Sequence, residues 1–249
     1  MIFAAGLGTR LRPITNTIPK ALVPVGGRPL IAHVLERLRA AGFTRVVVNV
    51  HHFAQQIVDY LDANYKGVID IAISDESDRL LDTGGGIKKA RSLFDTSRPV
   101  LIHNVDIMSN ADLAALYDTV DCRASRPDAA LLVSWRQTKR YLLFDDKQCL
   151  RAWMNIQTGE VKCPREFTPD VARLTQLAFS GIHVMAPQAL EGLDDMPERF
   201  NIIDFYLKHC RDMAFMACRQ EGLKLLDVGK IETLDMAELF CPDSQNTSS

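Results

Sequence analysis

Residues 1–13 read MIFAAGLGTRLRP, and residues 14–25 continue as ITNTIPKALVPV. A short apolar run, Ile2–Ala4, ends in a turn that holds two glycines, Gly6 and Gly8. Glycines at this spacing leave backbone N–H groups free to face an anion, because no side chain stands in the way. A tight exit from a strand would explain the same spacing. The stretch therefore predicts a β-strand that leads into a candidate phosphate-binding loop.

The loop departs from two common phosphate-binding motifs. The dinucleotide motif G-x-G-x-x-G needs a third glycine where this chain has Leu11, and Pro13 interrupts the helix that should follow. A P-loop needs Gly-Lys followed by Ser or Thr, and that sequence does not follow here. These departures argue against a nicotinamide-dinucleotide oxidoreductase and against a P-loop protein.

The connection after the glycine turn is long and basic. The next helical pattern begins near Pro29, which leaves a connection of about twenty residues where a strand-to-helix loop usually has two to six. Three prolines limit its flexibility, and it carries the cations Arg10, Arg12 and Lys20. Fixed cations beside a glycine turn suit a triphosphate, although a solvated basic loop would have the same composition.

Farther along, short apolar runs alternate with amphipathic stretches. The runs predict strands at Ile2–Ala4, Arg45–Asn49, Ile69–Ile73, Val100–Asn104, Ala129–Val133, Leu177–Val184, Phe215–Cys218 and Leu223–Leu226. Strands that alternate with helices favour a Rossmann-like α/β domain with a mostly parallel sheet flanked by helices. Two β-like runs, Tyr141–Phe144 and Leu150–Asn155, predict a β-hairpin added to that sheet, and the polar stretch Thr158–Pro169 predicts a loop.

Composition limits the classes of function. The chain has 249 residues with 47% hydrophobic content, which supports one domain over residues 1–241 and a flexible polar tail over residues 242–249. Lys and Arg total 29 against 31 Asp and Glu, so no broad field predicts a nucleic-acid or membrane partner. The six cysteines form no C-x-x-C pair, which favours a cytoplasmic protein with free thiols and argues against zinc.

With its continuation, the glycine loop resembles the signature of the sugar-1-phosphate nucleotidyltransferases, also called nucleoside-diphosphate-sugar pyrophosphorylases. The resemblance rests on G-L-G-T-R-L-R-P-I-T at residues 6–15 and P-K-A-L-V-P-V at residues 19–25. It implies a glycosyltransferase A-like fold and substrates that are a nucleoside triphosphate and a sugar 1-phosphate. It also gives catalytic, phosphate-contacting roles to Arg10 and Lys20.

A second glycine cluster, Leu81-Asp82-Thr83-Gly84-Gly85-Gly86, opens a short helical stretch. Consecutive glycines indicate a close backbone approach, although a glycine-rich start of a helix would read the same way. The segment looks most similar to the branch with N-acetylmuramate 1-phosphate uridylyltransferases and some mannose-1-phosphate guanylyltransferases. The resemblance implies that the nucleotide is bound by Ala5, Gly6, Gly8, Thr9, Thr83, Gly84, Gly85 and Asn104.

Two aspartates at strand ends are the candidate ligands of Mg²⁺, which proteins usually hold with one or two carboxylates plus substrate phosphates. Asp106 follows the run Val100–Asn104, and Asp227 ends the run that starts at Leu223. Aspartates are also common turn and cap residues. The resemblance strengthens both, because Asp227-Val228-Gly229 matches the family pattern. Val105 stands where the family usually has glycine before the first aspartate.

The acceptor side is less well marked. The strand around Phe179 to Val184 resembles a family segment that approaches the sugar phosphate, which makes Ser180 and Gly181 candidates. The Glu-Lys-Pro element of many members is missing after the hairpin, where Asn155 or Glu160 is the candidate replacement. We expect Mg-assisted nucleotidyl transfer to a sugar 1-phosphate, by uridylyl or guanylyl transfer. A catalytically weak homologue that senses sugar nucleotides is the alternative.

Overall fold

The computed structural model describes residues 1–121, 127–164, 168–238 and 240, which cluster into two compact units. Unit 1 is formed by described residues of Met1–Leu80, His103–Leu113 and Lys224–Ser249, and unit 2 by those of Leu81–Ile102 and Ala114–Leu223. The chain passes between the units after Leu80, inside strand β6 (Val100–Asn104), at the start of helix α4 (Leu113–Asp121) and after Leu223. No linker is needed at these crossings, so the sequence shows no break in composition there.

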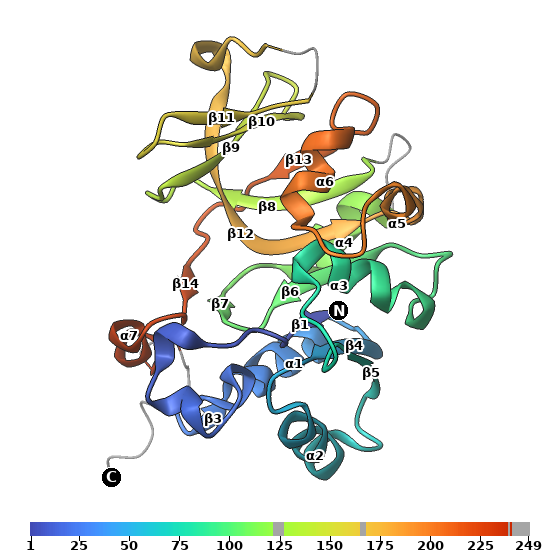
Figure 1. Cartoon of the computed structure of the whole chain (residues 1–249), viewed down its shortest axis with the longest axis vertical. Coiled ribbons are helices and arrows are strands. Elements are labelled where there is room, and N and C mark those ends of the chain that lie inside the picture. Colours follow the sequence, from blue (N-terminus) through green and yellow to red (C-terminus); the bar gives the residue numbers. More distant parts are fainter. Residues whose placement is uncertain (122–126, 165–167, 239, 241–249) are drawn as a thin grey trace. The chain divides into compact units, whose positions relative to one another are not determined.

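Unit 1 contains the glycine loop and a small parallel sheet (Figure 1). Its other strands and helices are β1 (Ile2–Phe3), β2 (Pro24–Val25), β3 (Arg28–Pro29), α1 (Leu30–Ala40), β4 (Arg45–Val50), α2 (Ala54–Tyr65), β5 (Asp70–Asp75), β7 (Ile107–Ser109), β14 (Leu225–Asp227) and α7 (Leu234–Glu238).

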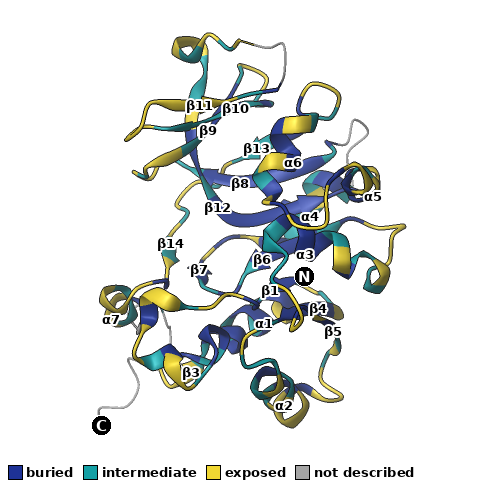
Figure 2. Ribbon diagram, in the orientation of Figure 1, coloured by how far each residue is buried: buried dark blue, intermediate teal, exposed yellow. Residues whose placement is uncertain are grey.

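The parallel sheet has the order β6-β1-β4-β5 in this unit. Ile2 pairs with Val48 on one side and with His103 on the other. The central strands are valine- and isoleucine-rich and buried, as expected for a parallel sheet covered on both faces (Figure 2). Together with the helices, this sheet confirms the predicted α/β class. The strands predicted in unit 1 are present, β6 with the predicted bounds and the others with one or both ends shifted.

The long connection after β1 is structured rather than open. Three short 3-10 turns, Thr9–Leu11, Ile14–Asn16 and Lys20–Leu22, are followed by the β2–β3 hairpin. Leu11, Ala21 and Val23 are fully buried and anchor this connection to the core. Helix α1 begins at Leu30, so the predicted start near Pro29 is confirmed.

Unit 2 contains a mostly antiparallel sheet with the order β11-β10-β9-β12-β8-β13, in which only the β8–β13 pair is parallel among the described strands. Its elements are α3 (Asp82–Ala90), most of α4, β8 (Ala129–Ser134), β9 (Arg140–Phe144), β10 (Leu150–Asn155), β11 (Glu160–Lys162), β12 (Thr175–Met185), α5 (Pro187–Glu191), α6 (Ile202–His209) and β13 (Phe215–Cys218).

The predicted hairpin is confirmed as β9 and β10, and β9 joins the sheet through β12. The polar stretch Thr158–Pro169 is not entirely a loop, because it contains strand β11, which pairs with β10. All three β11 residues are exposed, so this edge strand lacks the apolar alternation that would have revealed it. Residues 165–167 and the predicted tail 242–249 lie outside the described residues.

Candidate active site

In unit 1, the glycine loop follows the carboxyl end of β1 and is held from both sides. The Ala4 amide donates a hydrogen bond to the Asn49 side-chain oxygen at 2.8 Å. Gly8 adopts a left-handed backbone (φ 63°), and its carbonyl accepts from the Thr15 hydroxyl at 2.8 Å. A Cβ at Gly8 would come within 2.8 Å of the Thr15 side chain and 3.1 Å of Lys20. Gly8 is therefore required by the fold of the loop itself.

Gly6 differs from Gly8. It is exposed, its φ is ordinary, and nothing lies within 4 Å of the position that a Cβ would take. Ala5 beside it is buried, whereas Thr9 and Arg10 are exposed. The loop thus presents an open backbone at Gly6 with a cation a few residues away, as a phosphate-binding turn requires. The proposed contacts of Ala5, Gly6, Gly8 and Thr9 with a nucleotide stay predictions.

Asn49 is a positioning residue that the sequence reading missed. It lies in β4 and is 1% exposed, and its amide nitrogen donates to the Glu76 carboxylate at 2.7 Å. Glu76 is equally buried, at 1%. The network fixes the start of the glycine loop because Asn49 also accepts from Ala4. The signal was a single asparagine within the otherwise apolar strand Val46–Val50.

Lys20 and Asp106 form an ion pair in unit 1, although 86 residues separate them in the chain. Their side chains are only 11% and 18% exposed. A partly buried ion pair is less screened by solvent than a surface pair, so both charges are held in place. Lys20 reaches this position from the 3-10 turn Lys20–Leu22, which follows Pro19.

The strand pair β7–β14 brings the two predicted metal ligands together. Asp227 pairs in register with Ile107, directly after Asp106. The Val228 amide donates to the Asp106 carbonyl oxygen at 2.8 Å. The structure therefore places Asp106, the residue before β7, close to Asp227, which ends the adjacent antiparallel strand β14. Neither β7 nor its pairing with β14 was predicted from the sequence.

The Arg10 side chain lies beside Asp227 and Gly229. A Cβ on Gly229 would lie 2.6 Å from an Asp227 carboxylate oxygen and 2.7 Å from an Arg10 guanidinium nitrogen. Arg10, Asp227 and Gly229 are thus immediate neighbours. The four residues predicted for catalysis and metal binding, Arg10, Lys20, Asp106 and Asp227, come from three separate stretches of the chain and meet in unit 1.

The backbone before Asp106 explains the departure from the family pattern. Val105 is 4% exposed, and its amide donates to the Phe3 carbonyl at 3.1 Å. The side chain that replaces the usual glycine is therefore packed into the core. Asn104 is half-buried at the end of β6, where its carbonyl accepts from His103 Nδ1 at 2.8 Å. Its contact with the nucleotide stays a prediction.

Two buried histidines are excluded from proton transfer near neutral pH. Burial lowers the pKa of His103 to about 4, despite its hydrogen bond to Asn104. Burial likewise lowers the pKa of His183, in unit 2, to about 3. Both rings are neutral at pH 7, and His183 contacts the Tyr206 hydroxyl inside the core. They are structural residues.

In unit 2, the second glycine cluster packs against the chain's own segment Glu198–Phe200. A Cβ on Gly84 would overlap the Phe200 ring, and one on Gly85 would overlap the Glu198 carbonyl. The Gly84 and Gly85 amides both donate to the Phe200 carbonyl, at 2.9 and 3.2 Å. The Thr83 hydroxyl accepts from the Ile202 amide at 3.0 Å at the start of α6. Packing therefore accounts for these residues, and their nucleotide contacts stay predictions.

The predicted acceptor residues Ser180 and Gly181 lie in a bulge of β12. Phe179 pairs with Val133 and His183 with Leu131, so three residues of β12 face one residue of β8. Gly181 has φ 79°, and the Ser180 hydroxyl accepts from the Ile182 amide at 3.2 Å. Asn155 ends β10, where its side chain accepts from the Gln157 amide at 3.0 Å. Their sugar-phosphate role stays a prediction.

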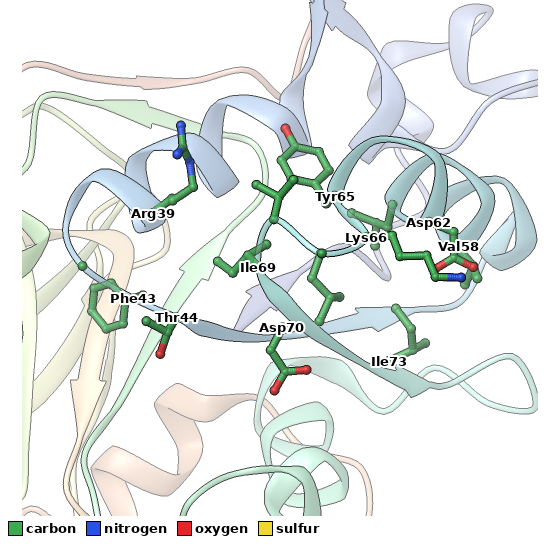
Figure 3. Close-up of a pocket in the computed structure, with 15 residues that line it drawn as sticks. Arg39, Phe43, Thr44, Val58, Asp62, Tyr65, Lys66, Ile69, Asp70 and Ile73 are labelled. Carbon is green, nitrogen blue, oxygen red and sulfur yellow. The ribbon is translucent and has the colours of Figure 1, made fainter.

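A pocket of about 590 Å³ in unit 1 lies away from these residues (Figure 3). It is lined by the turn Gly42–Thr44, one side of α2, the turn Lys66–Ile69 and the start of β5. These are the amino ends of the parallel strands, whereas the glycine loop and Asp106 follow the carboxyl ends of β1 and β6. Ligands of open α/β sheets bind at the carboxyl ends. The pocket is therefore not the candidate active site.

Over the described ranges of the chain, no group of three or more His, Cys, Asp or Glu side chains could hold a metal ion. None of the helices described is both long and apolar enough to cross a bilayer. The candidate metal ligands thus remain the pair Asp106 and Asp227.

Comparison with known proteins bears on the site. A family model described as Nucleotidyl transferase matches residues 1–242. An N-acetylmuramate alpha-1-phosphate uridylyltransferase of Caulobacter vibrioides is 35% identical over 230 residues, which are 90% of this chain and 88% of the relative. A Neisseria meningitidis serogroup B protein of the same name is 32% identical over 194 residues, 78% of each chain.

The fold is also found among solved structures. The inositol-1-phosphate CTP transferase from T. maritima superposes with a TM-score of 0.75 at 12% sequence identity, over 100% of this chain and 96% of that chain. At this identity the likeness shows the fold alone. The predicted family, fold class and enzyme class agree with these matches.

Proposed function

The chain belongs to the nucleotidyl transferase family, and we propose that it transfers a uridylyl group from UTP to N-acetylmuramate 1-phosphate. The family membership supports nucleotidyl transfer from a nucleoside triphosphate to a sugar 1-phosphate. The choice of UTP and of N-acetylmuramate rests on the two relatives above, which have the same name as each other and each align with this chain over most of their length. Guanylyl transfer, the other version that the sequence leaves open, becomes an arm of the test.

One observation carries the proposal. Two carboxylates and two cations, from Asp106, Asp227, Lys20 and Arg10, surround the exit of a glycine loop in unit 1. Phosphoryl-type transfer needs little covalent chemistry from a protein and depends on positioning and charge neutralisation. A cluster of fixed charges beside an open backbone turn provides both.

The donor set fits a magnesium ion. Asp106 and Asp227 offer carboxylate oxygens, which are hard ligands, and Mg²⁺ is usually held by one or two carboxylates with substrate phosphates completing the shell. When bound, the ion would supply neutralisation of charge on the phosphate oxygens. We assign its ligation to these two aspartates.

The residues of the chain would then act as follows. The glycine loop holds the triphosphate, and Lys20 and Arg10 neutralise charge on the transferring group. An oxygen of the sugar 1-phosphate forms a bond to the α-phosphorus of UTP. The bond from that phosphorus to the bridging oxygen breaks, and its electron pair leaves with pyrophosphate. No protein nucleophile takes part. We assign Ser180, Gly181 and Asn155 to the acceptor and Thr83, Gly84 and Gly85 to the nucleoside.

We place this reaction in the cytoplasm. The four cysteines within the described residues, Cys149, Cys163, Cys210 and Cys218, are free thiols, as expected for a reducing compartment. The alternative of a catalytically weak sensor would be favoured by loss of a charged site residue, and Arg10, Lys20, Asp106 and Asp227 are all present.

The test is a matrix of UTP, GTP and CTP against N-acetylmuramate, N-acetylglucosamine, glucose and mannose 1-phosphates, with Mg²⁺, read as pyrophosphate release. We expect the highest kcat/KM for UTP with N-acetylmuramate 1-phosphate. A higher value for GTP with mannose 1-phosphate would replace the proposed substrates. Release from none of the pairs would support the sensor alternative.

A further inference from the structure

We propose that Trp135, Arg136 and Arg219 form a recognition surface in unit 2 for the sugar of the acceptor, and that this surface selects a sugar 1-phosphate bearing a carboxylate. The inference rests on the proposed function and deepens it. It adds contacts to the sugar beyond those assigned to Ser180, Gly181 and Asn155.

Strand pairing brings the three residues together. Trp135 directly follows the last residue of β8, and Arg219 directly follows the last residue of β13. These strands are parallel neighbours, with Leu132 opposite Cys218. Both residues therefore stand at the carboxyl ends of adjacent parallel strands, the position at which α/β sheets bind ligands.

Trp135 is unusually open for its type. It is 65% exposed, although tryptophan is highly buried on average. The Arg219 guanidinium lies over its ring, 5.5 Å from the centroid. A guanidinium over an aromatic face is attracted to it and can still donate N–H groups to an acceptor. An exposed indole with a cation over its ring forms a platform that has both an apolar and a positively charged part.

Arg136 connects the platform to the predicted acceptor segment. Its guanidinium donates to the Phe179 carbonyl at 2.9 Å. Phe179 begins the bulge that contains Ser180 and Gly181. Arg136 therefore joins the platform to the backbone of β12 next to Ser180 and Gly181, both of which are buried.

The charge of this recognition surface is uncompensated within the described part of the chain. There, neither Arg136 nor Arg219 forms an ion pair with a carboxylate, whereas Arg151 and Arg199 in the same unit each do. Two guanidiniums that have no carboxylate partner among the described residues, beside an aromatic face, suit a ligand that is anionic and has an apolar face. A pyranose ring provides the apolar face, and a carboxylate matches the planar fork of arginine.

This chemistry separates two otherwise similar acceptors. N-acetylmuramate 1-phosphate bears a carboxylate in addition to its phosphate, and N-acetylglucosamine 1-phosphate has the same ring without that carboxylate. Arginines that bind the carboxylate discriminate between the two acceptors, whereas arginines that bind the shared phosphate do not. We assign Arg219 to the carboxylate and the Trp135 ring to the sugar face.

The experiment uses the fact that the chain has two tryptophans, Trp135 and Trp153. Trp153 also has a cation over its ring, Lys162 at 5.2 Å, so it is the rival platform. In the Trp153→Phe protein, the emission of Trp135 reports acceptor binding in the presence of Mg²⁺ and α,β-methylene UTP, without turnover. We expect a saturable change in emission with N-acetylmuramate 1-phosphate. Adding Arg219→Gln should raise Kd about tenfold or more, as for a lost charge-assisted hydrogen bond.

With N-acetylglucosamine 1-phosphate, Arg219→Gln should change Kd by less than about threefold, because no carboxylate contact is lost. The exposed Arg173, paired with Asp170 elsewhere in unit 2, gives the control Arg173→Gln, for which no change is expected. An equal loss of affinity for both acceptors, no emission change from Trp135, or loss of acceptor binding through Trp153→Phe would each overturn the proposal.

Turnover measurements distinguish failure of the proposed function from failure of the acceptor surface. If binding behaves as expected but no triphosphate and sugar 1-phosphate release pyrophosphate, the proposed function fails and the acceptor surface stands. If the wild-type protein turns over N-acetylmuramate 1-phosphate and Arg219→Gln leaves its KM unchanged, the acceptor surface fails and the function stands.

Discussion

Asp106 directly precedes β7, and Asp227 ends β14, the antiparallel partner of β7. Asp227 pairs with Ile107, and the Asp106 carbonyl accepts a hydrogen bond from the Val228 amide at 2.8 Å. The pairing joins residues that are 121 positions apart in the chain. It brings close together two aspartates that are ordinary strand-end residues when considered separately.

The two aspartates should differ in their effect on stability. Asp106→Asn leaves the Lys20 ammonium partly buried without its anion, so we expect a loss of about 1–3 kcal/mol in the free energy of unfolding. Asp227 is exposed, so Asp227→Asn should change that free energy by less than about 0.5 kcal/mol. Urea unfolding measures both, with Asp62→Asn on the exposed side of α2 as the control. Equal stabilities of the two variants would contradict the Lys20–Asp106 pair.

Gly6→Ala should weaken binding of the triphosphate without destabilising the fold. Nothing lies within 4 Å of a Cβ at Gly6, so Gly6→Ala should leave the melting temperature unchanged or slightly raised. If the loop binds the triphosphate, the added methyl group should raise KM for UTP about tenfold or more by blocking close approach of the phosphates. An unchanged KM would remove Gly6 from the nucleotide site.

Gly229→Ala should act on catalysis instead. Its Cβ would meet the ends of the Asp227 and Arg10 side chains at 2.6 and 2.7 Å, and both ends can move without disturbing the core. We expect stability close to that of the wild-type protein and a fall in kcat of about tenfold or more, because displaced charges stabilise the transition state poorly. Thermal melting and initial rates test this. Wild-type kcat in a folded Gly229→Ala protein would show that Arg10 and Asp227 do not act together.

The sequence was most informative where a local pattern determines structure. Valine-rich runs such as Arg45–Asn49 were predicted as strands because buried parallel strands are continuously apolar, and the structure has β4 there. The apolar run that starts at Leu223 predicted a strand with Asp227 at its end, and β14 ends at Asp227.

The sequence was least informative where the structure depends on residues far apart in the chain. Strand β7 is only three residues long and follows Asp106 directly, so its pairing with β14 leaves no periodic signal. The Lys20–Asp106 pair and the Asn49–Glu76 network likewise need the folded chain. The glycines at 84 and 85 indicated a close backbone approach, but the sequence did not show that the partner is Glu198–Phe200 of the same chain.

The second glycine cluster gives a prediction about packing. Gly84→Ala would overlap the buried Phe200 ring, so we expect a loss of about 1–3 kcal/mol in the free energy of unfolding. Phe200→Leu should recover part of that loss, because it makes room for the methyl group, and the double variant should be more stable than additivity predicts. Denaturant unfolding of the four proteins in the cycle measures this coupling.

Gly85→Ala provides the contrast in that experiment. Its Cβ would overlap the Glu198 backbone carbonyl, which no side-chain substitution removes. We therefore expect Phe200→Leu to give no recovery for Gly85→Ala. The described packing would be contradicted if the stability losses of Gly84→Ala and Phe200→Leu were additive. It would also be contradicted if Phe200→Leu restored stability to the Gly85→Ala protein.

Acid should destabilise the fold through its buried histidines. Burial holds the pKa of His103 at about 4 and that of His183 at about 3, below the ordinary value of 6.5. Above pH 6.5 both histidines are neutral in the folded and in the unfolded chain, so they do not lower the free energy of unfolding. As pH falls below 6.5 the unfolded chain takes up protons that the folded chain does not, so stability declines down to about pH 4 and, for His183, about pH 3.

Each histidine should contribute a slope of about 1.4 kcal/mol per pH unit within this window. Urea unfolding at pH 7.5, 6.5, 5.5 and 5.0 measures the decline before most carboxylates titrate. Stability that stays constant from pH 6.5 to 5.0 would mean that these rings are protonated in the folded protein.

The initial rate of pyrophosphate release from UTP and N-acetylmuramate 1-phosphate with Mg²⁺, for wild-type and Asp227→Asn proteins, tests the two-aspartate site most directly. We predict turnover by the wild-type protein and a fall in kcat of about 100-fold or more in the variant, with unfolding unchanged. Wild-type turnover in Asp227→Asn would contradict the site, because the carboxylate that β14 places beside Asp106 would then have no part in the reaction.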